Sequence, residues 1–202
     1  MIKRSSLSYI NNLLKQNPDW KILDIGCGYT ANIYANTVAD AQDLSFFYKE
    51  KNFVRITENK LPFHDNEFDF VITSHVIEHV KDLDFFLKEI QRVGKKGYIE
   101  VPNKLEDNLV FENKKEHIWH LDFDDIENKL IISKKVQYFE PVLTVSTAKK
   151  FQKTFRRSLV IELFWNSNID YTFSNKEDEK INFSLLTILR KFFSKKIRNL
   201  LR

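Results

Sequence analysis

The stretch that decides the fold is Lys21–Ala31, with the sequence K-I-L-D-I-G-C-G-Y-T-A. An apolar run, interrupted only by Asp24, predicts a short buried strand that leads into the turn Gly26-Cys27-Gly28. Glycines at both ends of this turn let the backbone approach a ligand where a Cβ atom would collide. A strand that ends in such a turn is typical of nucleotide-binding α/β sheets, in which the ligand lies at the carboxyl ends of the strands.

Composition limits the class of protein. A chain of 202 residues with one cysteine is large enough to bury a core as one domain without a disulfide. No apolar run reaches the roughly 18 residues of a membrane span, so we expect a cytoplasmic protein. The formal net charge of +4 is unevenly distributed, because residues 181–202 contain six basic residues and no acid, whereas residues 1–180 carry −2. A weakly acidic body disfavours nucleic-acid binding by the domain itself.

Apolar strands and amphipathic helices alternate along the chain. The most regular helix is predicted for residues 83–93, with Asp82 as its N-cap and Gly94 as a left-handed C-terminal residue. The other predicted elements are a first helix capped by Ser5 or Ser6, strands at 37–43, 53–56, 68–73 and 98–101, a two-turn helix within 29–36, a helix at 146–157, and a hairpin of 159–165 with 170–173. Such alternation specifies a parallel, doubly wound α/β sheet.

Four stretches match one protein family in order and spacing. They are L-D-I-G-C-G (23–28), D-L-S (43–45), L-P-F-H-D-N-E-F-D-F-V-I-T-S-H-V-I-E-H-V (61–80) and a segment that ends in I-E-V-P-N (99–103). Together they resemble the class I S-adenosylmethionine-dependent methyltransferases, in the group of small proteins with an L-P-F…F-D-x-V…E-H-V signature. The resemblance implies a Rossmann-like, three-layer α/β/α fold. Its doubly wound seven-stranded sheet would have an antiparallel last strand, with residues 159–173 as the final hairpin.

The resemblance also implies S-adenosylmethionine as methyl donor and S-adenosylhomocysteine as product. Asp24, Gly26 and Gly28 match the glycine-rich motif beside the methionine moiety. Cys27 lies inside this turn, where we expect it to fill space. A sulfonium donor needs no covalent step on the enzyme, and no ordered base is evident beside the thiol.

The remaining cofactor contacts are assigned by the same resemblance. Asp43 matches the acid that binds the ribose hydroxyls, and Leu44 would then lie along the adenine. The family places an acid shortly before L-P-F to bind the adenine amino group, and the register here offers either Thr57 or Glu58. The predicted set is completed by Leu61, Ser74 and His75.

Methyl transfer to a hydroxyl requires alignment with the donor and removal of the acceptor's proton. Ser74-His75 follows the fourth strand, at the sheet edge where the methyl group would project, so His75 is the first candidate base. His79 comes one helical turn later as a second candidate, and Glu78 as an acceptor contact. The alternative is that Glu78 and His79 cap and pack the following helix.

A second polar group, E-H-I-W-H-L-D, occupies residues 116–122. The resemblance implies that this part of the chain shapes the acceptor pocket, which assigns His117, Trp119 and His120 to the acceptor. The alternative is a packed tryptophan between surface histidines. Tyr9 on the first helix is a further candidate, unless it belongs to the core. Two histidines near an acid suit a metal, but no further ligands follow at convincing spacing, so we expect none.

We expect residues 1–180 to form the methyltransferase domain, with residues 103–145 as its acceptor-pocket insertion. Residues 181–202 repeat apolar residues at helical spacing among basic ones, which predicts a basic amphipathic helix. Such a helix would dock on the body or on a second copy of the chain, or lie at the inner membrane surface. The protein would be a monomer or a homodimer.

The predicted function is methyl transfer to a small polar or anionic acceptor, such as a sugar- or phosphate-bearing precursor of a capsule or lipopolysaccharide glycan. The sequence leaves open whether oxygen or nitrogen accepts the methyl group. One alternative is a methyltransferase-like module that binds without turnover. Another is an NAD-dependent oxidoreductase, because Gly26-x-Gly28-x-x-Ala31 also fits a dinucleotide fingerprint. Asp24 within the strand and the signature at 61–80 argue against the oxidoreductase.

Overall fold

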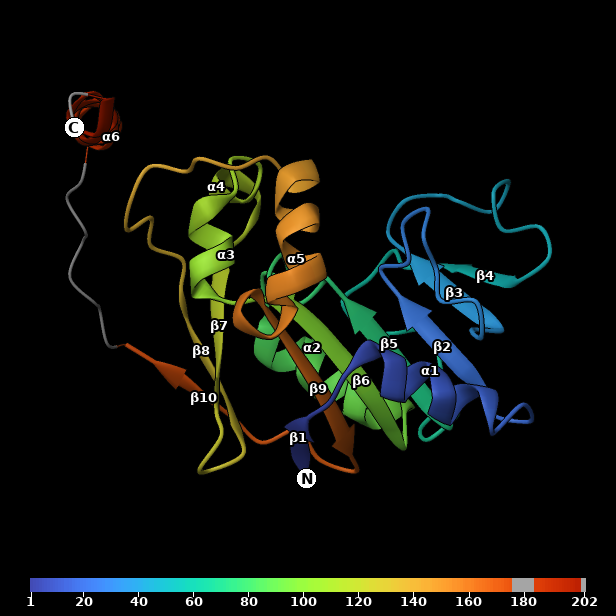
Figure 1. The fold of residues 1–202 in the computed structure, drawn as a ribbon. Helices are drawn as coiled ribbons and strands as arrows, with labels where there is room; N and C mark the ends of the chain where they lie inside the picture. The colour runs from blue at the N-terminus through green and yellow to red at the C-terminus, as the bar shows by residue number, and fades with distance from the viewer. Residues whose placement is uncertain (176–183, 201–202) are drawn as a thin grey trace.

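A computed structural model describes residues 1–175 and 184–200. Its centre is a sheet of seven strands in the order β1-β9-β6-β5-β2-β3-β4 (Figure 1). The strands are β1 (Ile2–Arg4), β2 (Ile22–Ile25), β3 (Thr37–Asp40), β4 (Asn52–Arg55), β5 (Phe70–Ser74), β6 (Lys96–Pro102) and β9 (Val160–Asn166). Strands β2 to β6 are parallel, and β9 is antiparallel to β6. The predicted seven-stranded α/β fold is therefore confirmed.

Two helices cover opposite faces of this sheet. Helix α1 (Leu7–Lys15) and helix α2 (Leu83–Val93) begin at the N-caps Ser6 and Asp82, whose side chains accept backbone hydrogen bonds. Ile10 of α1 packs in one apolar cluster with Ile22 and Ile72, whereas Leu87 of α2 packs with the alternate strand residues. Because successive side chains of a strand point to opposite faces, the two clusters lie on either side of the sheet.

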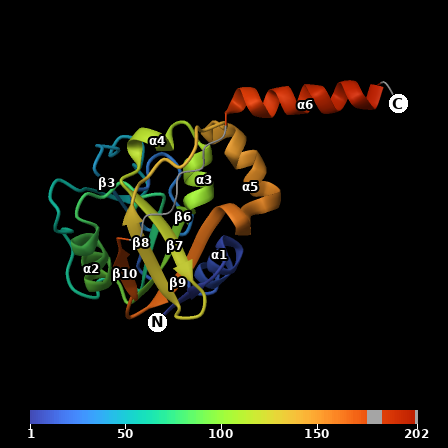
Figure 2. The same ribbon diagram turned by 90° about the vertical axis from the view of Figure 1, so that its left-hand side faces the viewer.

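A second sheet of three strands joins the α2 side of the core. It consists of β7 (Trp119–Asp124), β8 (Lys129–Lys134) and β10 (Tyr171–Ser174) in the order β10-β8-β7. Its buried residues Leu121, Leu130 and Ile132 belong to the same cluster as Trp165 of β9. Figure 2 shows this sheet in front of the central one.

The predicted closing hairpin of residues 159–173 is wrong. Strand β9 lies in the central sheet, but β10 leaves it and pairs in parallel with β8. The place beside β9 is taken by β1, in which Ile2 pairs with Trp165 and is fully buried. The apolar residues of β10 are used to extend the second sheet, which sequence periodicity alone did not reveal.

Two local predictions, one for the segment after β2 and one for the end of α2, are also wrong. Residues 29–36 form turns without a helix, and the hydrogen bond from Asn32 N to Asp24 Oδ2 helps to hold them against β2. Gly94 has an extended backbone, with φ −120° and ψ 145°, instead of a left-handed one. Its small size is required by packing, since a Cβ atom there would lie 2.4 Å from Val71 Cγ2.

Three helices lie beyond the carboxyl ends of the parallel strands (Figure 1). They are α3 (Lys104–Leu109), α4 (Asn113–Glu116) and α5 (Val145–Leu159), and α5 corresponds to the helix predicted at 146–157. These helices come from the segment that follows Pro102, so this segment forms the cover over the edge of the sheet where a ligand is expected.

Helix α6 (Leu185–Leu200) projects away from the body of the fold in Figures 1 and 2. It exposes the apolar side chains of Leu189, Phe192, Phe193 and Ile197. The predicted segment 181–202 reaches beyond this helix into residues that lie outside the described part of the chain. Among the described residues, no helix is both long and apolar enough to cross a membrane.

Candidate active site

The glycine turn after β2 is held open by its own geometry. Gly26 and Gly28 have φ angles of +66° and +48°, a region that side-chain-bearing residues rarely adopt. A Cβ atom on Gly26 would lie 2.4 Å from Val76 Cγ2, whereas one on Gly28 would meet nothing within 4 Å. The Tyr48 hydroxyl donates a hydrogen bond to Gly28 O (2.8 Å) and accepts one from Ala31 N (3.1 Å). The hydroxyl of Tyr48 thus fixes the turn on one side, while the side of Gly28 where a Cβ atom would lie is free.

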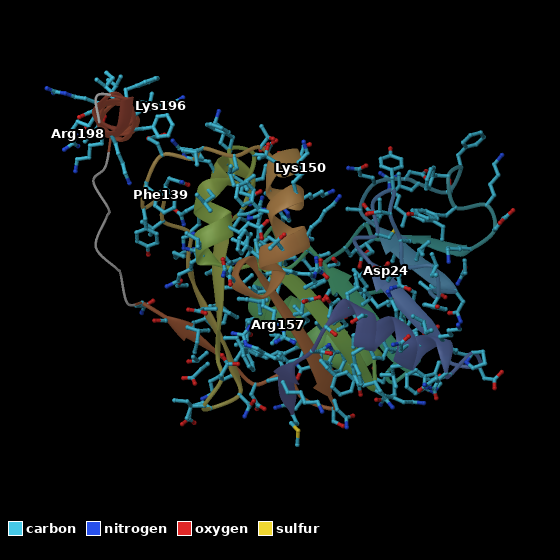
Figure 3. The ribbon with its side chains drawn as sticks, viewed as in Figure 1. Asp24, Phe139, Lys150, Arg157, Lys196 and Arg198 are labelled. Carbon is cyan, nitrogen blue, oxygen red and sulfur yellow. The ribbon has the colours of Figure 1, made fainter. Side chains whose placement is uncertain are left out.

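Asp24 lies buried beneath this turn, at the end of β2 that faces α5 (Figure 3). Burial raises the pKa of its carboxyl to about 6, although a hydrogen bond from Asn32 N and the charge of Lys51 oppose the shift. Burial also raises the pKa of the Cys27 thiol to about 11, with a further contribution from Asp24. The thiol therefore stays protonated at neutral pH and is no nucleophile.

Two cavities meet at Gly26. The first, of about 390 Å³, lies between the glycine turn and the helices α3, α4 and α5. Its polar lining includes Asp24, Ser74, His75, His79, Glu106, Asn113, His117, Lys149 and Gln152. The second, of about 490 Å³, lies along the ends of β3 and β4. It is lined by Asp40, Ala41, Ile56, Thr57, Glu58 and Leu61, among others.

The acid beside the glycine turn is Asp40 and not Asp43. Asp40 is the last residue of β3, and its Oδ2 accepts a hydrogen bond from Gly28 N at 2.9 Å. Asp43 lies three residues beyond the strand, exposed to solvent, and binds the backbone N–H and hydroxyl of Ser45. It lines neither cavity. The D-L-S motif thus indicates an acid that lies outside both cavities, whereas the last residue of β3, Asp40, lines the second cavity.

Five other predicted site residues also lie away from the two cavities. Glu78, a predicted acceptor contact, is fully buried and lines neither of them. Leu44 is buried in the core beside Tyr48, so it does not face a ligand. Tyr9 is half-exposed and lines a separate hollow beside β1. Trp119 lies in β7 of the second sheet, where its indole N–H donates to Val80 O, and His120 is fully buried. These side chains lie in the core, in the second sheet or at the protein surface, which the motif positions did not indicate.

His75 has an unusual backbone and a charged environment. It follows β5 with φ +56°, and its N–H donates to Glu100 O. Its Nδ1 lies 3.4 Å from Glu78 Oε1 and its Nε2 lies 3.4 Å from Glu100 Oε1. Desolvation lowers the pKa of His75, but the two carboxylates more than offset this and raise it to about 10. An imidazolium has no lone pair to accept a proton, which argues against His75 as the base.

Glu100 of β6 connects His75 to Tyr98 on the same strand and to Arg156 of α5. Its Oε2 accepts hydrogen bonds from the Tyr98 hydroxyl at 2.6 Å and from Arg156 Nη2 at 2.7 Å. Although burial opposes it, hydrogen bonds from His75 and Tyr98 and the charge of Arg156 lower the pKa of Glu100 to about 2. The carboxylate is therefore a fixed negative charge that keeps His75 protonated.

Glu106 was missed by the sequence interpretation. This residue of α3 is almost fully buried and lines the first cavity. Its Oε1 accepts a hydrogen bond from Gln152 Nε2, and no described residue donates to its Oε2. Desolvation raises the pKa of Glu106 despite that hydrogen bond. Only the packing of α3 against α5 creates this environment, so no local sequence signal pointed to it.

Asp107 organises the histidines of the second predicted group. Its carboxylate lies 2.6 Å from His117 Nδ1, 2.9 Å from His120 Nε2 and 2.6 Å from Lys135 Nζ. Although burial opposes the shift, these partners hold the pKa of Asp107 well below its usual range. His117 is thereby fixed at the first cavity, where its ring meets that of His79 edge to face with centroids 4.6 Å apart.

Comparison with known proteins adds three findings. Residues 23–99 match a family model described as a methyltransferase domain. An uncharacterized protein of Methanocaldococcus jannaschii is 29% identical over 199 residues, covering 78% of this chain and 84% of that protein. A ubiquinone biosynthesis O-methyltransferase of Pelagibacter ubique is 30% identical over 109 residues, covering 45% of each chain. The present chain therefore spans less than half of that enzyme.

Solved structures are similar at a lower level. A protein from Pyrococcus horikoshii shares 16% identity with a TM-score of 0.43, covering 80% of this chain and 92% of its own. A SAM-dependent methyltransferase from Aquifex aeolicus shares 14% identity with a TM-score of 0.41, covering 79% of this chain and 92% of its own.

Proposed function

Residues 23–99 match a methyltransferase-domain family model, and from this premise we propose that they form a class I S-adenosylmethionine-dependent methyltransferase domain that methylates a small polar acceptor. The acceptor would bind in the cavity between the glycine turn and helices α3 to α5. The observation that carries the proposal is the junction of two cavities at Gly26, one suited to a nucleoside and the other lined by polar side chains.

The cofactor would lie across this junction. The outer side of the turn has room for the methionine moiety, because nothing lies within 4 Å of a Cβ position on Gly28. Asp40 is placed to accept hydrogen bonds from the ribose hydroxyls. Thr57 and Glu58 line the far part of the second cavity, where the adenine amino group would need an acceptor. Asp24 would face the cationic end of the donor, which favours its ionised form.

The chemistry of methyl transfer assigns the remaining roles. The oxygen or nitrogen of the acceptor attacks the methyl carbon, the carbon–sulfur bond breaks, and a neutral thioether leaves. Correct alignment in a closed cavity supplies much of the rate, on the order of 7–11 kcal/mol for well-oriented groups. The proton of the acceptor passes to the free Oε2 of Glu106, because a carboxylate with a raised pKa is an effective base near neutral pH.

Charge near the cavity favours an acceptor that carries an anionic group. Lys149 lines the first cavity and, together with Lys150 and Lys153 of the same helix, also lines a neighbouring surface hollow. Figure 3 labels Lys150 on α5. A phosphate- or carboxylate-bearing sugar would place its polar ring among Glu106, Asn113 and Gln152 and its anion beside these lysines. This supports a surface-glycan precursor as the acceptor class.

Helix α6 supports a peripheral contact of the enzyme with an anionic membrane surface. Apolar Phe192 and Phe193 are exposed beside the basic Lys195 and Lys196. Such a contact would bring the active site to a lipid-linked acceptor. Flotation with anionic vesicles tests it against neutral vesicles, and dimerisation in analytical ultracentrifugation without vesicle binding would assign the helix to a second copy instead.

The test of the proposed function separates binding from turnover. Isothermal titration is expected to show one S-adenosylmethionine site per chain, and absence of binding at millimolar cofactor overturns the proposal. Incubation with methyl-labelled donor and a fractionated pool of sugar phosphates is then expected to transfer label to an acceptor. Cofactor binding without transfer to any fraction would favour the binding module over the enzyme.

A further inference from the structure

Three side chains from two segments converge beside the first cavity, which His79 and His117 line and behind which Glu78 is fully buried. Glu78 and His79 follow β5, and His117 follows α4. Each offers one ligand atom, and the three atoms all lie within 4.8 Å of one another. We propose that Glu78, His79 and His117 bind a divalent first-row transition metal ion, with Zn²⁺ as the first candidate. Two imidazoles and one carboxylate form a ligand set that suits such ions.

The two histidines are oriented as metal-binding histidines are. His117 Nδ1 lies 2.6 Å from Asp107 Oδ1, and His79 Nδ1 lies 3.1 Å from the backbone carbonyl oxygen of Glu116. Both acceptors favour a proton on Nδ1, which leaves the Nε2 lone pair of each ring for a ligand. Asp107 is itself held by Lys135, so the orientation of His117 is supported by a second layer of contacts.

Glu78 provides an independent indication. Its side chain is fully buried, yet neither carboxylate oxygen accepts a hydrogen bond from any described residue. The nearest positive group is His75, with Nδ1 at 3.4 Å from Oε1. A buried carboxylate without hydrogen bonds is costly, and this one keeps unused coordination capacity. A bound cation would satisfy it.

Three protein ligands leave further coordination positions, and His79 and His117 both face the first cavity. An open position is the feature that separates catalytic from structural zinc sites. A catalytic role for the ion rests on the proposed function. If the cavity binds the methyl acceptor, the ion would bind an acceptor oxygen and lower the pKa of that oxygen. The proton then passes to Glu106, the oxygen bonds to the methyl carbon, and the sulfur leaves as the thioether. Metal binding itself does not depend on that function.

The experiment measures metal binding without cofactor or acceptor. Protein stripped with a chelator is titrated with Zn²⁺ by calorimetry, its metal content is determined after gel filtration, and Co²⁺ is added as a spectroscopic probe. We expect about one ion per chain and visible Co²⁺ absorption of a nitrogen- and oxygen-ligated site. Absence of binding in the wild-type protein overturns the proposal.

Variants distinguish this site from adventitious binding. Glu78→Gln keeps the shape of its side chain, and His79→Ala changes a solvent-exposed residue, so both are expected to fold. Each should lower the affinity for Zn²⁺ about 100-fold or more, whereas the exposed control His64→Ala should bind as the wild type does. Unchanged affinity in both ligand variants, or equal loss in His64→Ala, overturns the assignment.

Separate cofactor titrations keep the two proposals distinguishable. Stripped protein that binds S-adenosylmethionine but no metal would reject the metal site and leave the proposed function intact. Protein that binds Zn²⁺ through these residues but no S-adenosylmethionine would reject the function and leave the site intact. Retained cofactor binding in Glu78→Gln and His79→Ala would also show that their loss of metal is not loss of fold.

Discussion

The two halves of the site are built in different ways. The cofactor half consists mainly of backbone: the turn at 26–28, the end of β3 with Asp40, and the hydroxyl of Tyr48 that holds the turn. The acceptor half consists of buried charged side chains, such as Glu106 and Asp107, that helices α3 and α5 hold over the sheet. The first half depends on local conformation, and the second depends on contacts between distant segments.

This difference teaches where substitutions should act. Changes in the cofactor half should affect donor affinity and leave the chemical step alone. Changes in the acceptor half should affect the rate of transfer or the charge state of the cavity and leave donor affinity alone. Each of the following variants tests whether the two halves of the site can be changed separately.

Replacing Glu106 by Gln should have the largest effect. The amide cannot accept the acceptor's proton, so kcat should fall about 10²–10⁴-fold while the affinity for S-adenosylmethionine stays within a factor of three. Single-turnover transfer of labelled methyl, together with calorimetry of the cofactor, measures both quantities. The exposed control Glu127→Gln should behave as wild type. A normal kcat in Glu106→Gln would remove Glu106 from the mechanism.

Replacing Asp40 by Ala should weaken cofactor binding and spare the acceptor half. Loss of hydrogen bonds to a charged group costs about 1.5–3 kcal/mol, which corresponds to roughly 10–100-fold in Kd. The matched control is Asp43→Ala, three residues away and exposed, for which we expect no change. If Asp43→Ala weakens binding and Asp40→Ala does not, the ribose acid lies where the sequence motif placed it.

Replacing Asp24 by Asn should have opposite effects on stability and on function. The pKa of about 6 in the folded protein lies above the usual aspartate value of 3.8, so the wild type loses stability as pH rises from about 4 to 6. Asn avoids this loss and can still accept from Asn32 N. Above pH 6 the free variant should therefore be more stable, by up to about 3 kcal/mol, and bind the cofactor more weakly. Chemical denaturation at pH 4 and pH 7.5 measures this. A variant less stable at pH 7.5 would contradict the stated environment of Asp24.

The titration of His75 should change activity least, but it predicts a definite direction for the change of stability with pH. Its folded pKa of about 10 lies above the usual 6.5, so its contribution to stability is complete below pH 6.5 and is lost as pH rises towards 10. Nuclear magnetic resonance of the imidazole should show a cation at pH 7.5. A measured pKa near 6.5 would return His75 to the list of candidate bases.

How much the sequence could reveal follows the same division. The strand that contains Asp24, the glycine turn after it and the helix at 83–93 give local sequence patterns. The structure contains all three elements where the sequence predicts them. The proposed ribose-binding acid depends on where β3 ends, because the strand ends at Asp40, three residues before the Asp43 of the motif. The motif D-L-S carried no information about that end.

The acceptor half could be predicted only in outline. The alternation in W-H-L-D-F-D of β7 has the period of a strand, although no strand is among the elements predicted within residues 103–145. The role of Glu106 depends on Gln152, which lies 46 positions later, and the fixed ring of His117 depends on Asp107, with its partner Lys135. Contacts of this kind leave no periodic pattern, because they arise only when α3, α5 and the second sheet pack together.

The central claim is that the turn at 26–28 and Asp40 hold S-adenosylmethionine with its sulfur directed into the cavity that contains Glu106. A crystal structure with S-adenosylhomocysteine tests it most directly. We predict the homocysteine moiety over Gly28, the ribose hydroxyls bound to Asp40, and the adenine in the cavity that Glu58 lines. A nucleoside bound outside this cleft, or a ribose bound by another residue while Asp40 keeps only its contacts to Gly28 N and Gln42 N, would contradict the account.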